Sequence, residues 1–403
     1  MSDEQERGKP QASHADPTHR SSLIAHRSAD ASLIAHRSLG VAHINAERGF
    51  SGGEVQVFLL MEGLAQRGHR NLLICPPGSE AAAEAARRGI DTALVKMRGD
   101  ADAPAVWRIA AAVRAAGVDL LHLHTWRASW LGGWAARLAR RPAVVTRRMD
   151  RPVKPGWETR QIYLRGSRRT AAIAPAIAAQ LAAGGVPRER LVVIPSAVDP
   201  ARITPRHPRS AVRAGLGAAD GELVLLTLAS LVRRKGIDVL LDALAALGAR
   251  GQRPHAWIAG GGPEGAALQA QASALGLDRQ LRWLGVRADG ADLLAAADVF
   301  VMPSRAEGLG VAALEAMAAG CPVVASDVGG LGDAVRQAGG GVLVPPGDAV
   351  ALADALATLL HEPALRARLA AAGPAGIAAG FSADSMVAAY EQLYAEVLAE
   401  EPR

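Results

Sequence analysis

This sequence has few cysteines, few aromatic residues and no long apolar run. Its 403 residues include two cysteines, Cys75 and Cys321, and neither has a second cysteine or a histidine at metal-ligand spacing. A disulfide framework and a structural zinc site are therefore not expected, which fits a reducing cytoplasm. The N-terminal MSDEQERGKP lacks the apolar core of a secretory signal. We expect a soluble cytoplasmic protein, or a peripheral one at the inner face of the cytoplasmic membrane.

The first 38 residues differ from the rest. They are polar and contain the heptapeptide SLIAHRS twice, at Ser22–Ser28 and Ser32–Ser38. The period of ten matches no solenoid repeat. We interpret residues 1–38 as a disordered or linker-like tail, either a recently duplicated linker or the result of a start codon placed too early. The alternative, that the histidine and arginine of the duplicate bind a metal or a phosphate, is less favoured. The remaining length predicts two domains rather than one.

From residue 41 onward, short apolar runs alternate with alanine-rich helical stretches, which is typical of parallel sheets covered by helices on both faces. We predict an α/β fold of two doubly wound, Rossmann-like domains, at 39–200 and 201–380, with a ligand cleft between them. A last helix at 381–403 would pack back across the first domain. The predicted strands are Val41–Asn45, Asn71–Cys75, Thr92–Met97, Asp119–His124, Ala143–Thr146, Ala171–Ala174, Leu191–Pro195, Glu222–Ser230, His255–Gly260, Leu281–Gly285, Val299–Ser304, Cys321–Ser326 and Gly341–Pro345.

Two carboxylates stand out in PSRAEGLGVAALEAMAAGCPVVAS, the stretch Pro303–Ser326. Glu315 is the one charge in a helical run of alanine, leucine, valine and methionine, and Glu307 precedes that run. Burying an unpaired carboxylate costs several kcal/mol. A vicinal diol, such as a ribose, would satisfy Glu315 because two hydroxyl groups can donate to its two oxygens. The alternative is a glutamate on the outer, solvated face of the helix.

Several turns between a strand and a helix could bind an anion. Gly308 and Gly310 allow a ligand to approach the backbone, and the amides of Leu309, Gly310 and Val311 should point out of a helix N-terminus. Arg234 and Lys235 open another helix and could neutralise a diphosphate, and Gly52 and Gly53 form a similar turn in the first domain. Each of these could also be an ordinary loop.

Other motifs are less specific. His122 and His124 alternate on one strand, where hydrogen-bonded core histidines are common, and no third metal ligand lies near them in the sequence. Gly260–Gly265 matches G-x-G-x-x-G formally, but it follows the second strand of its domain and no acid ends the next strand, so a nicotinamide-binding site has little support.

From Arg147 to Arg169 there are eight basic residues and two acids, which accounts for the whole net charge of +6. This segment is either a solvated loop or a site for an anionic partner.

These motifs, in this order, resemble those of the retaining glycosyltransferases of family 4, which have the GT-B fold. The elements are EGLGVAALE, which matches the family's E-x7-E, then SGGEVQVFLLMEGLAQRGH, DLLHLH, LVVIPSAVD, KGID, AGGGPE and FSADSMVAAYEQLY. Together they cover nearly all of residues 41–395. The resemblance implies an acceptor site in the first domain, a nucleotide-sugar site in the second, and no requirement for a metal or other cofactor.

The resemblance also implies residue roles. Glu307 would hold the hydroxyls of the donor sugar, Glu315 would bind the ribose, and Lys235, helped by the amides of residues 309–311, would neutralise the leaving diphosphate. His124 matches a histidine near the acceptor and the reacting sugar. The implied partners are a nucleotide-sugar and a glycan or glycolipid of the cell envelope, such as lipopolysaccharide core. Family members retain anomeric configuration either by double displacement through Glu307 or by front-face attack, and we favour front-face attack.

Some positions depart from the family pattern. Ser230 replaces an arginine, which Arg233 or Arg234 could substitute, and Thr146-Arg147-Arg148 replaces T-x-H. We expect Arg147, Arg148 and Arg151 to contact an anionic acceptor or an anionic membrane surface. The basic segment lacks interleaved aromatic residues, so a nucleic-acid partner is not expected. The alternatives are a sugar-nucleotide epimerase or hydrolase, a nicotinamide enzyme, and a non-catalytic membrane-associated binding protein.

Overall fold

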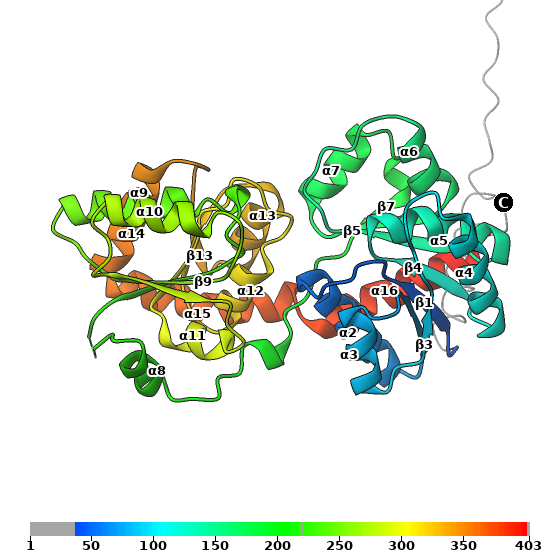
Figure 1. Cartoon of the computed structure of the whole chain (residues 1–403), viewed down its shortest axis with the longest axis horizontal. Coiled ribbons are helices and arrows are strands. Elements are labelled where there is room, and N and C mark those ends of the chain that lie inside the picture. Colours follow the sequence, from blue (N-terminus) through cyan, green and yellow to red (C-terminus); the bar gives the residue numbers. More distant parts are fainter. Residues whose placement is uncertain (1–36, 220, 401–403) are drawn as a thin grey trace, which may run out of the picture.

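The computed structural model describes residues 37–219 and 221–400, so the duplicated tail segment lies almost wholly outside the described residues. The chain forms two lobes, each built on a parallel sheet (Figure 1). Each of the thirteen predicted strand segments overlaps one observed strand. The strands of the first lobe are β1 (Gly40–Ile44), β2 (Arg70–Cys75), β3 (Thr92–Leu94), β4 (Leu120–Leu123), β5 (Ala143–Arg147), β6 (Arg169–Ala172) and β7 (Leu191–Val193), and those of the second are β8 (Val224–Leu228), β9 (His255–Ala259), β10 (Leu281–Gly285), β11 (Val299–Met302), β12 (Val323–Ser326) and β13 (Gly341–Val344).

The strand order is β3-β2-β1-β4-β5-β6-β7 in the first lobe and β10-β9-β8-β11-β12-β13 in the second, and neighbouring strands pair parallel throughout. The predicted architecture of two doubly wound, Rossmann-like domains is therefore confirmed. In each sheet the order reverses once, between β1 and β4 and between β8 and β11. Ligands of such sheets bind where the order reverses, outside the carboxyl ends of the strands.

Helices cover both faces of both sheets. In the first lobe they are α2 (Gly52–Gln66), α3 (Glu80–Arg88), α4 (Ala103–Ala115), α5 (Trp126–Ala139), α6 (Trp157–Thr159) and α7 (Pro175–Ala183). A π-helical turn at Arg160–Arg165 follows α6, and single 3-10 turns occur at Arg188–Arg190, Pro200–Arg202 and Arg233–Lys235. The later helices are α8 (Arg209–Gly215), α9 (Ile237–Ala249), α10 (Gly265–Ala274), α11 (Gly290–Ala296), α12 (Val311–Ala318), α13 (Gly329–Ala338), α14 (Ala349–His361), α15 (Pro363–Gly380) and α16 (Ala383–Ala399).

Alternation along β1 shows how the first sheet is covered. Val41 is buried with side chains of α2 and α16, whereas Ala42 and Ile44 are buried with side chains of α4 and α5. Successive side chains of a strand point to opposite faces, so these two sets of helices lie on opposite sides of the sheet. Helix α16 follows α15 of the second lobe in sequence but packs in the first lobe (Figure 1).

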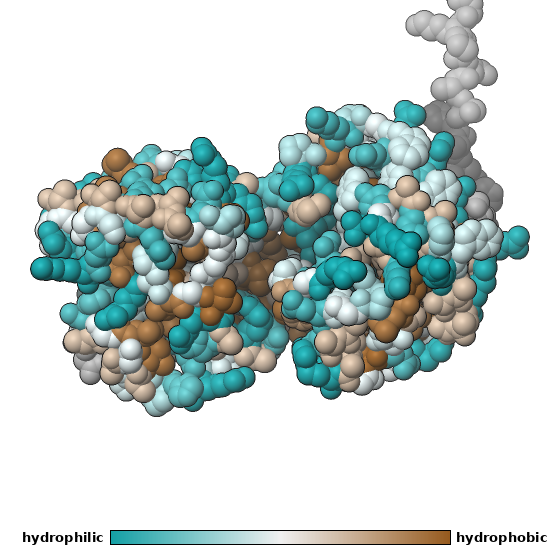
Figure 2. All heavy atoms as spheres, in the orientation of Figure 1, coloured by the Kyte–Doolittle hydropathy of each residue, from teal (hydrophilic) through white to brown (hydrophobic). Residues whose placement is uncertain are grey.

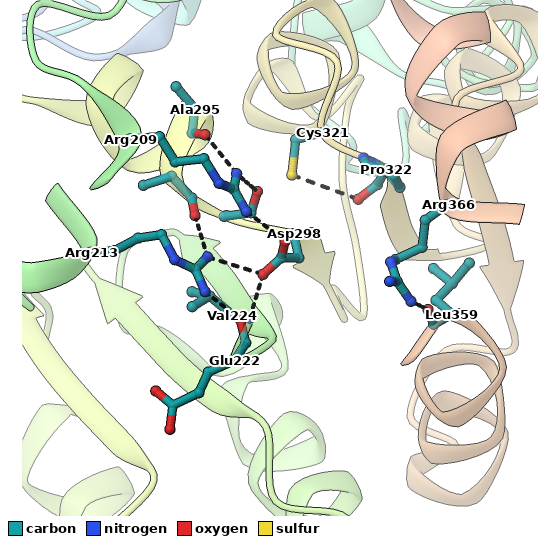
Figure 3. Close-up of polar contacts among 12 residues, drawn as sticks. Arg209, Arg213, Glu222, Val224, Ala295, Asp298, Cys321, Pro322, Leu359 and Arg366 are labelled. Carbon is teal, nitrogen blue, oxygen red and sulfur yellow. Dashed lines mark hydrogen bonds and ion pairs between the residues drawn. The ribbon is translucent and has the colours of Figure 1, made fainter. Parts of the chain in front are cut away.

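The start of the second lobe is fixed by a polar network at the end of its sheet remote from the cleft (Figure 3). Arg209 and Arg213 on α8 donate to the Asp298 carboxylate at 2.6 and 3.1 Å, and the amide of Val224 donates to the same carboxylate at 2.8 Å. Arg213 is buried, so pairing it satisfies a charge that would otherwise destabilise the fold. Nearby, burial raises the pKa of the Cys321 thiol to about 12, which excludes it as a nucleophile near neutral pH.

Candidate active site

A cleft of about 1170 Å³ lies between the lobes and is lined by residues from both (Figure 2). It lies at the carboxyl ends of the strands, where both sheets reverse their order. All but one of the sequence-predicted site residues line it: Gly52, Gly53, His124, Arg147, Arg148, Arg234, Lys235, Glu307, Gly308, Leu309, Gly310, Val311 and Glu315. The exception is Arg151, which is exposed and whose carbonyl accepts a hydrogen bond from Arg147 at 3.0 Å.

Glu307 and Lys235 form an ion pair in the wall that the second lobe contributes to the cleft. They come from the loops after β11 and β8, and their side chains are only 13 and 11% exposed. Arg234 lies 3.6 Å from the same carboxylate. Arg305, in the loop after β11, donates to both oxygens of Asp238 in the first turn of α9, at 2.6 and 2.7 Å. Such a bidentate pair fixes geometry as well as charge, so the lysine and the glutamate are held in place before a ligand arrives.

The N-terminus of α12 opens into the cleft between these charges and Glu315. Gly310 precedes the helix with φ +76° and no side chain caps it, so the first amides of α12 are available to an anion. The left-handed backbone conformation favours glycine there, and a Cβ would also crowd the end of the Leu331 side chain, at 2.6 Å. At Gly308 a Cβ would lie 2.6 Å from the carbonyl oxygen of Arg148, so the two lobes touch at this residue.

Glu315 is buried and lines the cleft, so the alternative of an exposed, outward-facing glutamate is wrong. Its side chain is 5% exposed and forms an ion pair with Arg202, which lies in the segment joining the lobes. Burial raises the pKa of the Glu315 carboxyl, and the Arg202 guanidinium opposes that rise. A ligand that bound Glu315 through hydroxyl groups would have to compete with this guanidinium.

Three buried histidines lie together below the first-lobe wall of the cleft. The sequence offers no third metal ligand near His122 and His124, but the structure brings His43 from the neighbouring strand β1. One ring nitrogen from each of the three histidines lies within 4.8 Å of the other two. Protein groups already engage His122, because its nitrogens lie 2.7 Å from the Tyr394 hydroxyl and 2.6 Å from the Thr146 hydroxyl. The cluster is thus satisfied by hydrogen bonds of the chain itself.

Arg148 fixes the direction of hydrogen bonding in this cluster. A guanidinium can only donate, so Nδ1 of His124, 3.3 Å from Arg148, accepts. Nε2 of His124 then carries the proton and donates to Nδ1 of His43 at 3.0 Å, and His43 donates through Nε2 to Asn71 at 3.0 Å. The chain of hydrogen bonds holds His124 neutral with Nδ1 toward Arg148.

The histidine cluster should make stability depend on pH. Burial lowers the pKa of all three histidines, to about 4 for His43, whereas in the unfolded chain they titrate near the usual value of 6.5. As pH falls from 6.5 toward 4, only the unfolded chain takes up these protons, so the free energy of unfolding falls. The loss is up to about 1.4 kcal/mol per pH unit for each histidine that stays neutral in the folded chain. Denaturant unfolding of His43→Gln between pH 7.5 and 5 should show a smaller loss than the parent chain. Equal slopes of the free energy of unfolding against pH in the variant and the parent chain would contradict this. The control is His361→Gln, an exposed position, which should behave as the parent chain does.

Other predicted positions fall into place on geometric grounds. Ser230, which stands where the family has an arginine, lines the cleft without a charge. Of the two arginines that could substitute for the missing one, Arg234 lines the cleft and Arg233 does not. Packing explains two glycines of Gly260–Gly265, because a Cβ would lie 1.8 Å from the Ala229 carbonyl oxygen at Gly260 and 2.4 Å from that of Leu231 at Gly262. The resemblance of this loop to a nicotinamide-binding motif therefore has a structural cause.

Some residues around the cleft and the histidine cluster could not be identified from the sequence, because they lie far along the chain from the groups they contact. They are His43, Arg202 and the pair Tyr390 and Tyr394 on α16, which contact the histidine cluster. The spacing of the two tyrosines by four residues, one face of a helix, was a usable signal. No pattern around Arg202 indicated that it would reach Glu315.

Two family models match the chain. Glycosyl transferases group 1 matches residues 208–375, and Glycosyltransferase Family 4 matches residues 50–202. A D-inositol 3-phosphate glycosyltransferase of Xylanimonas cellulosilytica is 33% identical over 70% of this chain and 73% of its own length. The lipopolysaccharide core biosynthesis glycosyltransferase LpsE of Rhizobium meliloti is 32% identical over 59% of this chain and 67% of its own length. The chain spans only 51 to 63% of the length of four other curated relatives that it matches.

Solved structures show the same architecture. Anabaena Alr3699/HepE, crystallised with UDP-glucose, superposes with a TM-score of 0.77 over 88% of this chain and 99% of its own, at 23% identity. At that identity the likeness shows the fold alone, and it confirms the predicted GT-B fold.

Proposed function

The chain belongs to the glycosyl transferases group 1 of family 4, and on that premise we propose that it moves a sugar from a nucleotide-sugar to a hydroxyl of an anionic envelope glycan or glycolipid, with retention of anomeric configuration. One observation carries the proposal: the ion-paired Glu307 and Lys235, the open N-terminus of α12 and the buried Glu315 line one cleft. A sugar, a diphosphate and a ribose, taken in order, would match those three features.

The donor would bind mainly to the second lobe. Its diphosphate would take the place that Glu307 now occupies beside Lys235 and would receive the amides of α12, so that charge on the leaving group is neutralised by groups already in position. Glu307, released from Lys235, would accept hydrogen bonds from the sugar hydroxyls. The ribose would displace Arg202 from Glu315. The HepE structure with UDP-glucose supports a donor of this class.

The reaction we favour is front-face attack. The bond from the anomeric carbon to the diphosphate oxygen breaks, and the bond to the acceptor oxygen forms on the same face. The acceptor proton passes to the departing phosphate oxygen, so no side-chain base is needed. The state of His124 supports a mechanism without a side-chain base. His124 is neutral and its Nδ1 faces Arg148, so we assign it to positioning groups rather than to taking up a proton. We expect no metal to be required.

The acceptor would carry negative charge. Arg147 and Arg148 line the first-lobe wall of the cleft, and each has a buried Nε without a hydrogen-bond partner. The relative from Xylanimonas is named for a phosphorylated acceptor, D-inositol 3-phosphate, and LpsE for lipopolysaccharide core. Both names fit an anionic acceptor. No helix among residues 37–219 and 221–400 is long and apolar enough to cross a bilayer. We propose that the protein meets a lipid-linked acceptor by peripheral association with the membrane, with the active site on the cytoplasmic side.

A thermal-shift screen with UDP-, GDP-, ADP- and CMP-sugars tests the donor class. One nucleotide should stand out, with about 2.7 kcal/mol of stabilisation when it exceeds its Kd a hundredfold. Incubation of that donor without an acceptor separates the rivals, because an epimerase would give the epimeric donor and a hydrolase would give free sugar at the full rate. Failure of every nucleotide to raise the melting temperature would contradict the proposal. Retention is tested by NMR of the product's anomeric configuration.

A further inference from the structure

Five of the chain's seven tryptophans lie on α4, α5 and α6, on the flank of the first lobe (Figure 1). Trp126, Trp130 and Trp134 are spaced by four residues, so they share one face of α5. Trp126 lines the cleft, whereas Trp130 and Trp134 line a second groove of about 520 Å³ between α4 and α5. Eight residues of helix span about 12 Å, so this row of indoles leads from the active site to the outer surface.

Four of these side chains form what we call the tryptophan face: Trp107, Trp130, Trp134 and Trp157. Trp107 is 62% exposed, Trp157 61% and Trp134 40%, and the rings of Trp130 and Trp157 meet edge to face with centroids 4.8 Å apart. Large exposed indoles that gather in one place are unusual on a soluble surface and mark a binding site. In a chain with 3% aromatic residues this concentration is a local feature.

The polar groups of the groove are already engaged. Asp102 accepts hydrogen bonds from the backbone amides of Arg98 and Ala105, and Asp100 forms an ion pair with Arg127. The Arg137 guanidinium lies 5.6 Å from the ring centroid of Trp134. The rest of the lining is alanine, valine, leucine and tryptophan. A sugar would find few free hydrogen-bonding partners here, so the groove suits an apolar ligand.

The surrounding segment is strongly basic. Residues 100–170, which include the whole lining of the groove, contain 14 lysines and arginines against five aspartates and glutamates. Their net charge is +9, whereas the whole chain carries +6, so the remainder carries −3. Arg108, Lys154 and Arg160 are exposed and lie within three positions of Trp107 or Trp157 in the sequence. Indoles beside cations match the headgroup region of an anionic bilayer, where tryptophan lies at the interface and each basic residue near the surface adds attraction.

From these observations we infer that the tryptophan face docks on an anionic lipid bilayer. The indoles enter the headgroup region, and the arginines and Lys154 lie against lipid phosphates. The row from Trp134 to Trp126 then joins the bilayer to the cleft, so the lobe that would bind the acceptor is held at the membrane. The role of docking in holding this lobe at the membrane rests on the proposed lipid-linked acceptor, but the docking itself can be measured without any sugar transfer.

The test is co-sedimentation with phosphatidylcholine vesicles that contain or lack phosphatidylglycerol. The parent chain should bind the anionic vesicles with a blue shift of tryptophan fluorescence, and should bind the neutral ones far less. The triple variant Trp107→Ala, Trp134→Ala, Trp157→Ala should lose anionic-vesicle binding roughly tenfold or more, and Arg108→Glu with Arg160→Glu should do the same. Matched controls on the other lobe are exposed Val350→Ser and Arg253→Glu, which should bind as the parent does.

Other outcomes separate the possible occupants. Undiminished vesicle binding by the triple variant would overturn the inference, as would a parent chain that ignores anionic vesicles. Loss of affinity for a detached, water-soluble glycan in the triple variant, with vesicle binding intact, would assign the groove to sugar instead. A parent dimer that the triple variant abolishes, without vesicle binding by either, would assign it to a second copy. Vesicle binding together with no transfer to any acceptor would support the docking surface and count against the proposed function alone.

Discussion

Replacing Lys235 with alanine should reduce sugar transfer about 10²–10³-fold, the loss seen when one preorganised group that stabilises developing charge is removed. Lys235 is the cation closest to Glu307 in the cleft, and its ammonium is nearly buried, so water would replace it poorly. The effect should fall mainly on kcat, because charge on the leaving diphosphate develops in the transition state. Steady-state kinetics at saturating donor measure it.

Lys96→Ala is the matched control for this variant, since Lys96 is exposed and lies outside the cleft. Its kinetics and melting temperature should equal those of the parent chain. Glu307→Gln should also lose activity, because a neutral amide no longer balances Lys235 and Arg234 or accepts as strongly from sugar hydroxyls. Transfer by Lys235→Ala at close to the parent rate would remove the diphosphate assignment.

Replacing Glu315 with glutamine should weaken donor binding about 10–150-fold, the equivalent of the 1.5–3 kcal/mol that a hydrogen bond to a charged group contributes. The carboxylate is buried on α12 and lines the cleft, and we assign its two oxygens to the two ribose hydroxyls. The effect should appear in the KM for donor and in the Kd for the nucleoside diphosphate, with a smaller change in kcat. Calorimetric titration gives the Kd directly.

A nucleotide that lacks both ribose hydroxyls separates this role from a structural one. The parent chain should bind the 2′,3′-dideoxynucleotide much more weakly than the ribonucleotide, whereas Glu315→Gln should bind the two about equally. If Glu315→Gln instead kept the full preference for the ribonucleotide, the ribose would be bound elsewhere. Exposed Glu362→Gln, at the end of α14, is the control.

Much of the fold could be predicted because its signals are local. A strand buried on both faces needs an apolar run, and each of the thirteen runs predicted as strands overlaps a strand, from Gly40–Ile44 to Gly341–Val344. Glu315 could be found for the same reason, because a carboxylate in an apolar helix requires a partner. Glu307 could be found because it lies beside the glycine-rich turn that precedes this helix.

The histidine cluster could not be assembled from the sequence alone. Whether His43 meets His122 depends on β1 lying beside β4 in register, and strand order is set by long-range packing. The pairing of Arg202 with Glu315 depends likewise on the path of the segment that joins the lobes. In both cases the residue types were visible in the sequence, but their distance along the chain hid the contact.

The central claim is that Glu307, Lys235, the amides of α12 and Glu315 together form a nucleotide-sugar site. The most direct measurement is a crystal structure with the nucleoside diphosphate that raises the melting temperature most. We expect the diphosphate between Lys235 and the N-terminus of α12, the ribose hydroxyls within hydrogen-bonding distance of Glu315, and Arg202 displaced from that carboxylate. A nucleotide bound outside this cleft, or one that leaves the Arg202–Glu315 pair intact, would contradict the account.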